Sequence, residues 1–165
     1  MSDKSNADGT PNVLFLEDAI NGKWGAGAAR VICSITDPFV RHHGALGSFV
    51  RVYLKNKADV CDVARYCQSL PQVELALESE EAAKEMELAV DREGDIVVVA
   101  SKHAVIGSRK EEHDLANLEN HKLRSHGGIS EQDIPLLMSR PMRKPAEARI
   151  GGWRNFDAFD LVLNN

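Results

Sequence analysis

The run Asp95-Ile-Val-Val-Val-Ala100 is the feature that most constrains the fold of this chain. After Asp95 it is continuously apolar and does not alternate with polar residues. A run of this kind is typical of a strand that is buried on both faces of a layered sheet. Strand and helix signals alternate along the preceding sequence, so the pattern predicts an α/β fold.

The expected elements follow from apolar runs and from helix-capping residues. Helices are predicted after the cap residues Asp18, Asp59 and Ser79. Strands are predicted at 13–16, 30–35, 49–54, 73–77, 95–100, 134–138 and 159–163. The polar turn at 91–94 marks a composition shift and predicts two parts. Residues 1–92 form a small α/β cap domain, and residues 93–165 contribute strands that look like pieces of a larger, incomplete core sheet.

Charge, apolar content and cysteine spacing exclude several classes of protein. The 165 residues carry a net charge of -5 with scattered lysine and arginine, which argues against nucleic-acid binding. No apolar run approaches the roughly 20 residues of a membrane span, and the polar first ten residues lack a signal core. Cys33, Cys61 and Cys67 have no CxxC spacing, which favours reduced, packed thiols in a cytoplasmic protein.

A histidine on a glycine-rich turn is the first candidate for chemistry. His126 precedes Gly127 and Gly128, which allow the backbone to come close to a ligand. Neutral imidazole is the commonest side-chain ligand of metal ions, and a backbone-bonded turn histidine is the competing interpretation. The adjacent His42 and His43 form a second candidate, either in a ligand-binding loop or in a solvated one.

The other histidines are weaker candidates. His113 and His121 lie in a charged segment and are expected at the surface. His103 follows the buried run and reads equally well as a structural histidine. The basic loop 140–149 is interpreted as a solubilising surface.

Several blocks of sequence resemble one known family. Residues 95–100, 123–132 and 134–136 are similar to the C-terminal part of the alkaline phosphatase superfamily, and more closely to phosphonoacetate hydrolase. Residues 28–32 and 35–49, with the block His-His-Gly-Ala-Leu-Gly-Ser, resemble the cap segment of that family. Residues 156–164 resemble its closing strand.

The resemblance implies hydrolysis of the carbon–phosphorus bond of phosphonoacetate to acetate and phosphate, at a site with two zinc ions and a threonine nucleophile. By position His126 corresponds to the last zinc ligand of the family. It is the single ligand that the resemblance assigns to this chain, and the resemblance assigns no catalytic residue to it. The family's Asp-His-Gly-Met motif and nucleophile would precede Met1. The chain therefore reads as a C-terminal fragment, from a truncated gene or a miscalled start, that is inactive in isolation.

Two other functions are compatible with these residues. One is a non-catalytic, cap-like module that complements a separate N-terminal half. The other is a different metal-dependent phosphoesterase of the same superfamily. The expected partners are a small phosphonate and, through uncovered sheet faces, further copies of the chain in a homo-oligomer.

Overall fold

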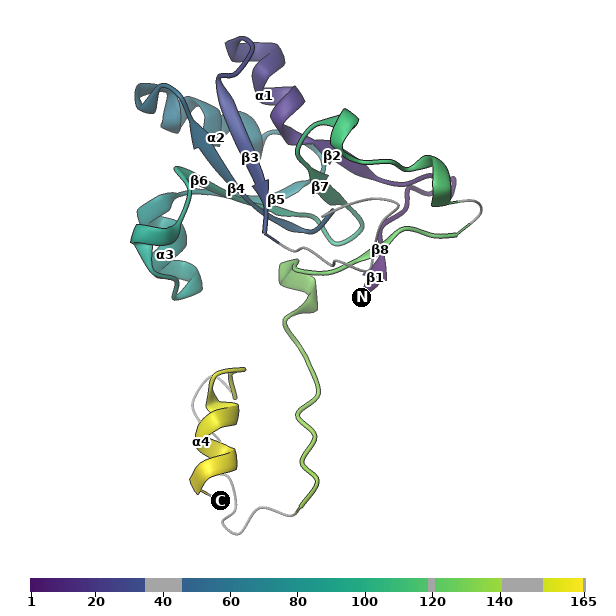
Figure 1. The fold of residues 1–165 in the computed structure, drawn as a ribbon, viewed down its shortest axis with the longest axis vertical. Helices are drawn as coiled ribbons and strands as arrows, with labels where there is room; N and C mark the ends of the chain where they lie inside the picture. The colour runs from purple at the N-terminus through teal and green to yellow at the C-terminus, as the bar shows by residue number, and fades with distance from the viewer. Residues whose placement is uncertain (35–45, 119–120, 141–152, 165) are drawn as a thin grey trace. The chain divides into compact units, whose positions relative to one another are not determined.

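The computed structural model describes residues 1–34, 46–118, 121–140 and 153–164, and the chain divides into two compact units (Figure 1). The first unit, Met1–Asp133, contains every strand among these residues. The second unit, Ile134–Asn165, contains one α-helix in its described part. Helices and sheets occur together in the first unit, so the predicted α/β class is confirmed.

A four-stranded antiparallel sheet forms the centre of the first unit, with the strand order β3-β4-β6-β5. The strands are β3 (Ala29–Cys33), β4 (Phe49–Leu54), β5 (Val73–Glu78) and β6 (Ile96–Ala100). The predicted strand 49–54 has the same bounds as β4. The other three predictions are confirmed with ends that shift by a residue or two, which is usual for element boundaries.

Strand β6 is buried along its whole length because its two faces pack against different layers. Its even-numbered residues join the core cluster that includes residues of α1 (Leu16–Trp24) and α2 (Val60–Gln68). Val97 and Val99 join a second cluster with α3 (Ser79–Met86). Because neither face meets water, the sequence of β6 has no polar alternation.

The predicted helices are confirmed; Asp59 is the N-cap of α2 as expected, whereas the N-caps of α1 and α3 are Phe15 and Glu78. Helix α1 begins at Leu16, and the Asp18 carboxylate accepts a hydrogen bond from the Lys110 amide (2.8 Å) instead of capping α1. Asp59 stands at the start of α2 without a side-chain cap bond, after the 3₁₀ turn η1 (Lys57–Asp59). Ser79 is the first residue of α3. Acidic residues in these first turns interact favourably with the helix dipole.

Two short ladders complete the first unit. The predicted strand at 13–16 is confirmed as β2 (Val13–Phe15), which pairs in parallel with β7 (Val105–Gly107). β1 (Ser2–Asp3) pairs antiparallel with β8 (Arg124–Ser125). The remaining 3₁₀ turns are η2 (Val90–Arg92), η3 (Lys110–Glu112), η4 (Ala116–Leu118) and η5 (Ile129–Glu131).

The two strands predicted near the C-terminal end are wrong. Residues 134–138 form no strand, and Ile134 and Leu137 are exposed. Pro135 lacks an amide hydrogen, which disfavours a ladder through this run. Residues 159–163 lie in the helix α4 (Asp157–Asn164), where the Asp157 carboxylate accepts a hydrogen bond from the Arg154 amide (2.9 Å). A five-residue apolar run does not distinguish strand from helix by its periodicity.

Strand β6, which the sequence assigned to a core beginning at residue 93, pairs with β4 and β5 in the sheet of the first unit. The division into a cap domain and a core refers to a complete enzyme and stays a prediction. None of the helices in the described residues is sufficiently long and apolar to span a bilayer.

Candidate functional site

The His126 turn lies directly after strand β8. His126 itself is exposed, whereas the neighbouring Ser125 and Gly128 are buried. Gly127 has φ of 99°, in the left-handed region that a side chain disfavours. The His126 carbonyl accepts a hydrogen bond from the Ser48 amide (2.9 Å). The backbone of His126 is thus anchored, while its side chain is exposed.

Side chains from both ends of the first unit converge behind this turn. The Glu131 carboxylate accepts hydrogen bonds from the Gly128 amide (3.1 Å) and from the Ser2 hydroxyl. Lys4 lies 3.5 Å from the same carboxylate and is completely buried. Burial raises the pKa of Glu131, but these hydrogen bonds and the Lys4 charge outweigh it and hold the pKa below its usual range.

The described residues do not by themselves form a metal site. They contain no group of three or more histidine, cysteine, aspartate or glutamate side chains placed to hold an ion. Catalytic zinc in proteins commonly takes about three protein ligands. The role of His126 as a metal ligand therefore stays a prediction, and the described ranges hold no set of further donors beside it.

The remaining histidines are distributed differently from expectation. His42 and His43 lie outside the described residues. His103 and His121 are exposed, as predicted for His121. His113 is buried, so its expected surface location is wrong. Its ring stacks on that of Phe15 with centroids 6.0 Å apart, because the turn η3 folds the charged segment back onto the core.

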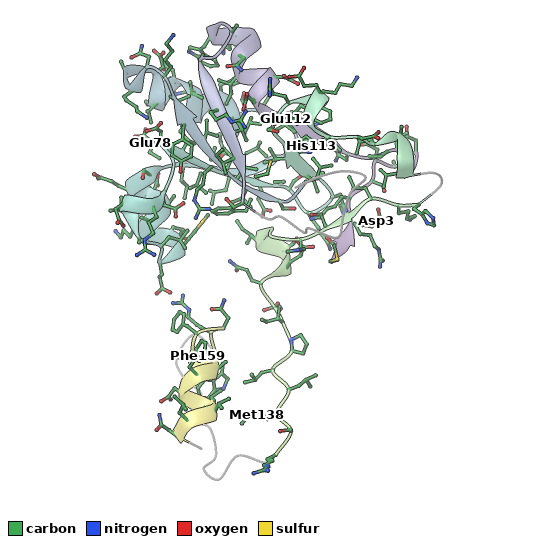
Figure 2. All side chains as sticks on the ribbon, in the orientation of Figure 1. Asp3, Glu78, Glu112, His113, Met138 and Phe159 are labelled. Atoms are coloured by element: carbon green, nitrogen blue, oxygen red, sulfur yellow. The ribbon has the colours of Figure 1, made fainter. Side chains whose placement is uncertain are left out.

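A polar cluster around Ser108 was not found by sequence reasoning; two of its members, Glu112 and His113, are labelled in Figure 2. His113 Nε2 accepts a hydrogen bond from the Ser108 amide (2.9 Å), and the Ser108 hydroxyl donates to Glu112. Bonds from Ser108 and Arg109 lower the pKa of Glu112 to about 2. The Ser108 hydroxyl also lies 3.1 Å from His113 Nε2, so Ser108, Glu112 and His113 form one connected polar cluster.

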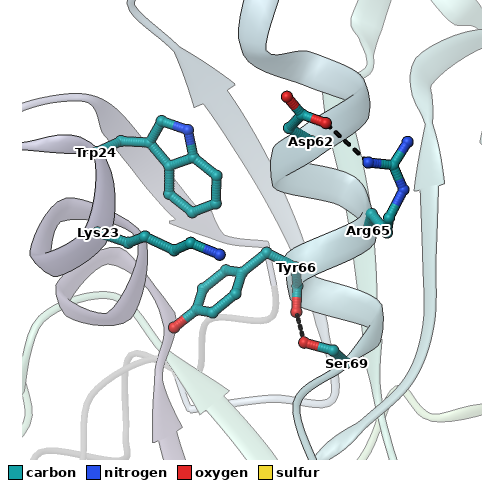
Figure 3. A pocket seen from close by; sticks show the side chains of 6 residues that line it. All are labelled: Lys23, Trp24, Asp62, Arg65, Tyr66 and Ser69. Carbon is teal, nitrogen blue, oxygen red and sulfur yellow. Dashed lines mark hydrogen bonds and ion pairs between the residues drawn. The ribbon is translucent and has the colours of Figure 1, made fainter.

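A shallow pocket of about 470 Å³ lies between α1 and α2 (Figure 3). Its lining residues are Lys23, Trp24, Asp62, Arg65, Tyr66 and Ser69. The Lys23 ammonium lies 4.4 Å from the Tyr66 ring centroid and 4.8 Å from that of Trp24. Arg65 forms an ion pair with Asp62 at 2.8 Å. Both cations of the pocket thus contact other residues that line it.

Comparison with known proteins identifies related enzymes. No protein-family model matches the sequence. Over 41 residues the chain is 58% identical to the phosphonoacetate hydrolase of Penicillium oxalicum. The matched segment covers 24% of this chain and 57% of that relative. Crystal structures of phosphonoacetate hydrolase from Sinorhizobium meliloti 1021, in complex with phosphonoformate and with phosphonoacetate, give TM-scores of 0.80 and 0.79. In both comparisons the sequence identity is 43%, over 96% of this chain and 38% of the enzyme.

The chain thus spans well under half the length of the solved enzymes, while nearly all of its own residues find a counterpart in them. An identity of 43% over that span extends the likeness from the fold to the sequence. The resemblance to phosphonoacetate hydrolase predicted from the sequence is therefore confirmed.

Proposed function

We propose that this chain is part of a phosphonoacetate hydrolase, which cleaves the carbon–phosphorus bond of phosphonoacetate to give acetate and phosphate. The observation that carries the proposal is the match to the Sinorhizobium enzyme, with a TM-score of 0.80 and 43% identity over 96% of the chain. The crystals of that enzyme hold phosphonoacetate and phosphonoformate, so the substrate we propose is a small phosphonate.

In this proposal His126 is one ligand of a zinc ion. Its exposed imidazole and its anchored carbonyl support the role. Zinc in such a site polarises phosphoryl oxygens and activates a nucleophile. Because His126 is the single zinc ligand that the family resemblance places in this chain, the isolated chain should neither retain zinc tightly nor release phosphate. The cytoplasmic location and the homo-oligomer stay predictions.

The experiment combines the chain with the part of the Sinorhizobium enzyme that it does not match. Phosphate release from phosphonoacetate and bound zinc are measured for the chain alone, for the mixture, and for a mixture that contains His126→Ala. We expect no release from the chain alone, release from the mixture, and a loss of on the order of 100-fold or more with His126→Ala, since the variant removes a zinc ligand. His121→Ala is the matched control, because His121 is also exposed.

The outcomes separate the proposal from its rivals. A mixture that hydrolyses a phosphate monoester but not phosphonoacetate would identify another metal-dependent phosphoesterase. A stable complex without any turnover would favour a non-catalytic module. Equal activity of the His126→Ala and His121→Ala mixtures would show that His126 is not a zinc ligand of the active site.

A further inference from the structure

Lys4 is the most unusual side chain in the first unit, because its ammonium is completely buried. Lysine is rarely buried in this way unless it is paired. The Lys4 ammonium donates a hydrogen bond to the Lys102 carbonyl (2.9 Å) and lies 3.5 Å from the Glu131 carboxylate. Lys102 belongs to the turn between β6 and β7, so Lys4 joins the central sheet to the segment that follows His126.

Glu131 links Lys4 to the His126 turn. One carboxylate oxygen faces Lys4 and accepts from the Gly128 amide (3.1 Å), and the other accepts from the Ser2 hydroxyl. Gly128 lies two residues after His126 and is buried, and an added Cβ there would make ordinary van der Waals contact with that of Ser48 at 3.4 Å. The carboxylate therefore fixes the glycine that ends the turn.

The opposite side of the turn is fixed by the backbone. The Ser48 amide donates to the His126 carbonyl (2.9 Å), while the Ser48 carbonyl accepts from Ala100 at the end of β6 (2.8 Å). On the chain before His126, the Lys4 amide donates to the Leu123 carbonyl (2.9 Å) and extends the β1–β8 ladder. The His126 turn is consequently held between two supports, one of them an ion pair whose lysine is completely buried.

We propose that Lys4 and Glu131 are a positioning pair, which sets the backbone of the His126 turn and so presents the imidazole to a metal ion in one orientation. The inference rests on the proposed role of His126. Neither residue touches the ion or the phosphonate; each acts through Gly128 and the strand before it.

The cost of the pair argues for a task beyond stability. Burying the Lys4 ammonium carries a desolvation penalty that its attraction to the partly exposed Glu131 need not recover, and apolar residues of similar size often stabilise a fold as well or better. A metal ligand, in contrast, needs its orientation held by its surroundings. The carboxylate is the group that can both accept from the Gly128 amide and neutralise Lys4.

The test uses the full chain without metal, so that it does not depend on turnover. The variants are Lys4→Met, Glu131→Gln and Glu131→Ala, and Lys122→Met is the matched control. Lys122 forms an exposed ion pair with Asp3 (2.7 Å) beside the same β1–β8 ladder. Two quantities are measured by NMR: hydrogen exchange of the Gly128 amide relative to the amides of β6, and the ring resonance of His126.

We expect Gly128 exchange to accelerate on the order of 100-fold in Lys4→Met, as for loss of one partner of a buried pair. Glu131→Gln keeps an acceptor for the Gly128 amide and should lie between wild type and Glu131→Ala. In these variants the single His126 ring resonance should shift or divide into several, while Lys122→Met changes neither readout. If Lys4→Met fails to fold, the same two measurements on Glu131→Gln and Glu131→Ala test the proposal.

Equal acceleration at Gly128 and in β6, with an unchanged His126 resonance, would mean that the pair only stabilises the fold and would overturn the proposal. The reconstituted assay is read separately. A His126 resonance that responds to the variants supports the positioning pair even if the mixture fails to hydrolyse phosphonoacetate, in which case the proposed function alone is refuted.

Discussion

Adding one methyl group at Gly94 tests whether β4 and β6 are packed as closely as the structure indicates. An ideal Cβ at Gly94 would lie 2.7 Å from the Val52 carbonyl oxygen and 3.1 Å from its amide nitrogen. Both are backbone atoms of a fully buried residue, and Val52 pairs with Ile96 where the two strands meet. Neither atom can move without displacing the central sheet.

The expected magnitude follows from the cost of overpacking. Extra methyl groups in a packed region cost about 1–3 kcal/mol. For a chain of this size, each kcal/mol lowers Tm by roughly 2–4 °C. An overpacking cost of about 2 kcal/mol in Gly94→Ala is partly offset, because alanine restricts the unfolded chain and recovers roughly 0.4–1 kcal/mol. The net loss of about 1–1.6 kcal/mol should lower Tm by about 2–6 °C.

Gly22→Ala is the matched control, because an added Cβ there meets nothing within 4 Å. Gly22 lies in the exposed part of α1, where alanine is favoured over glycine by about 0.5–1 kcal/mol. The same chemical change should thus raise Tm at residue 22 and lower it at residue 94. Urea unfolding followed by circular dichroism gives both free energies of unfolding. A Gly94→Ala variant as stable as Gly22→Ala would refute the packing of β4 against Gly94.

Two further predictions follow from single side chains. Because bonds from Ser108 and Arg109 lower the pKa of Glu112 from 4.5 to about 2, its contribution to folding is present above pH 4.5 and is lost as the pH falls toward 2. The stability advantage of wild type over Glu112→Gln should accordingly vanish across this interval in acid-unfolding curves; an advantage constant from pH 5 to pH 2 would contradict it. Burial raises the pKa of the Cys33 thiol to about 11 and that of Cys67 to about 12, whereas Cys61 is exposed, so iodoacetamide should label Cys61 first. Mass spectrometry of the native chain checks the order, and early labelling of Cys67 would be inconsistent with its buried position.

The central sheet was predictable because the apolar pattern of its strands indicates how each strand is buried. The run 95–100 has no polar position, and a strand of that kind must be covered on both faces. The predictions failed where a neighbour decides the structure. His113 has charged neighbours in sequence, and its burial follows from stacking on Phe15, nearly one hundred residues earlier. At residues 134–138, by contrast, Pro135 was a local signal against a strand.

The candidate site divides in the same way. His126 could be singled out because a histidine before two glycines is a local pattern, and Gly127 does adopt a positive φ. The residues that support its turn could not be predicted from the sequence. Lys4 and Glu131 are 127 residues apart, and each has polar neighbours that are typical of a solvated surface. A lysine becomes informative only when the fold removes it from water. In this chain the sequence thus identifies the histidine proposed as a metal ligand, and the tertiary structure identifies the ion pair proposed to hold its turn in place.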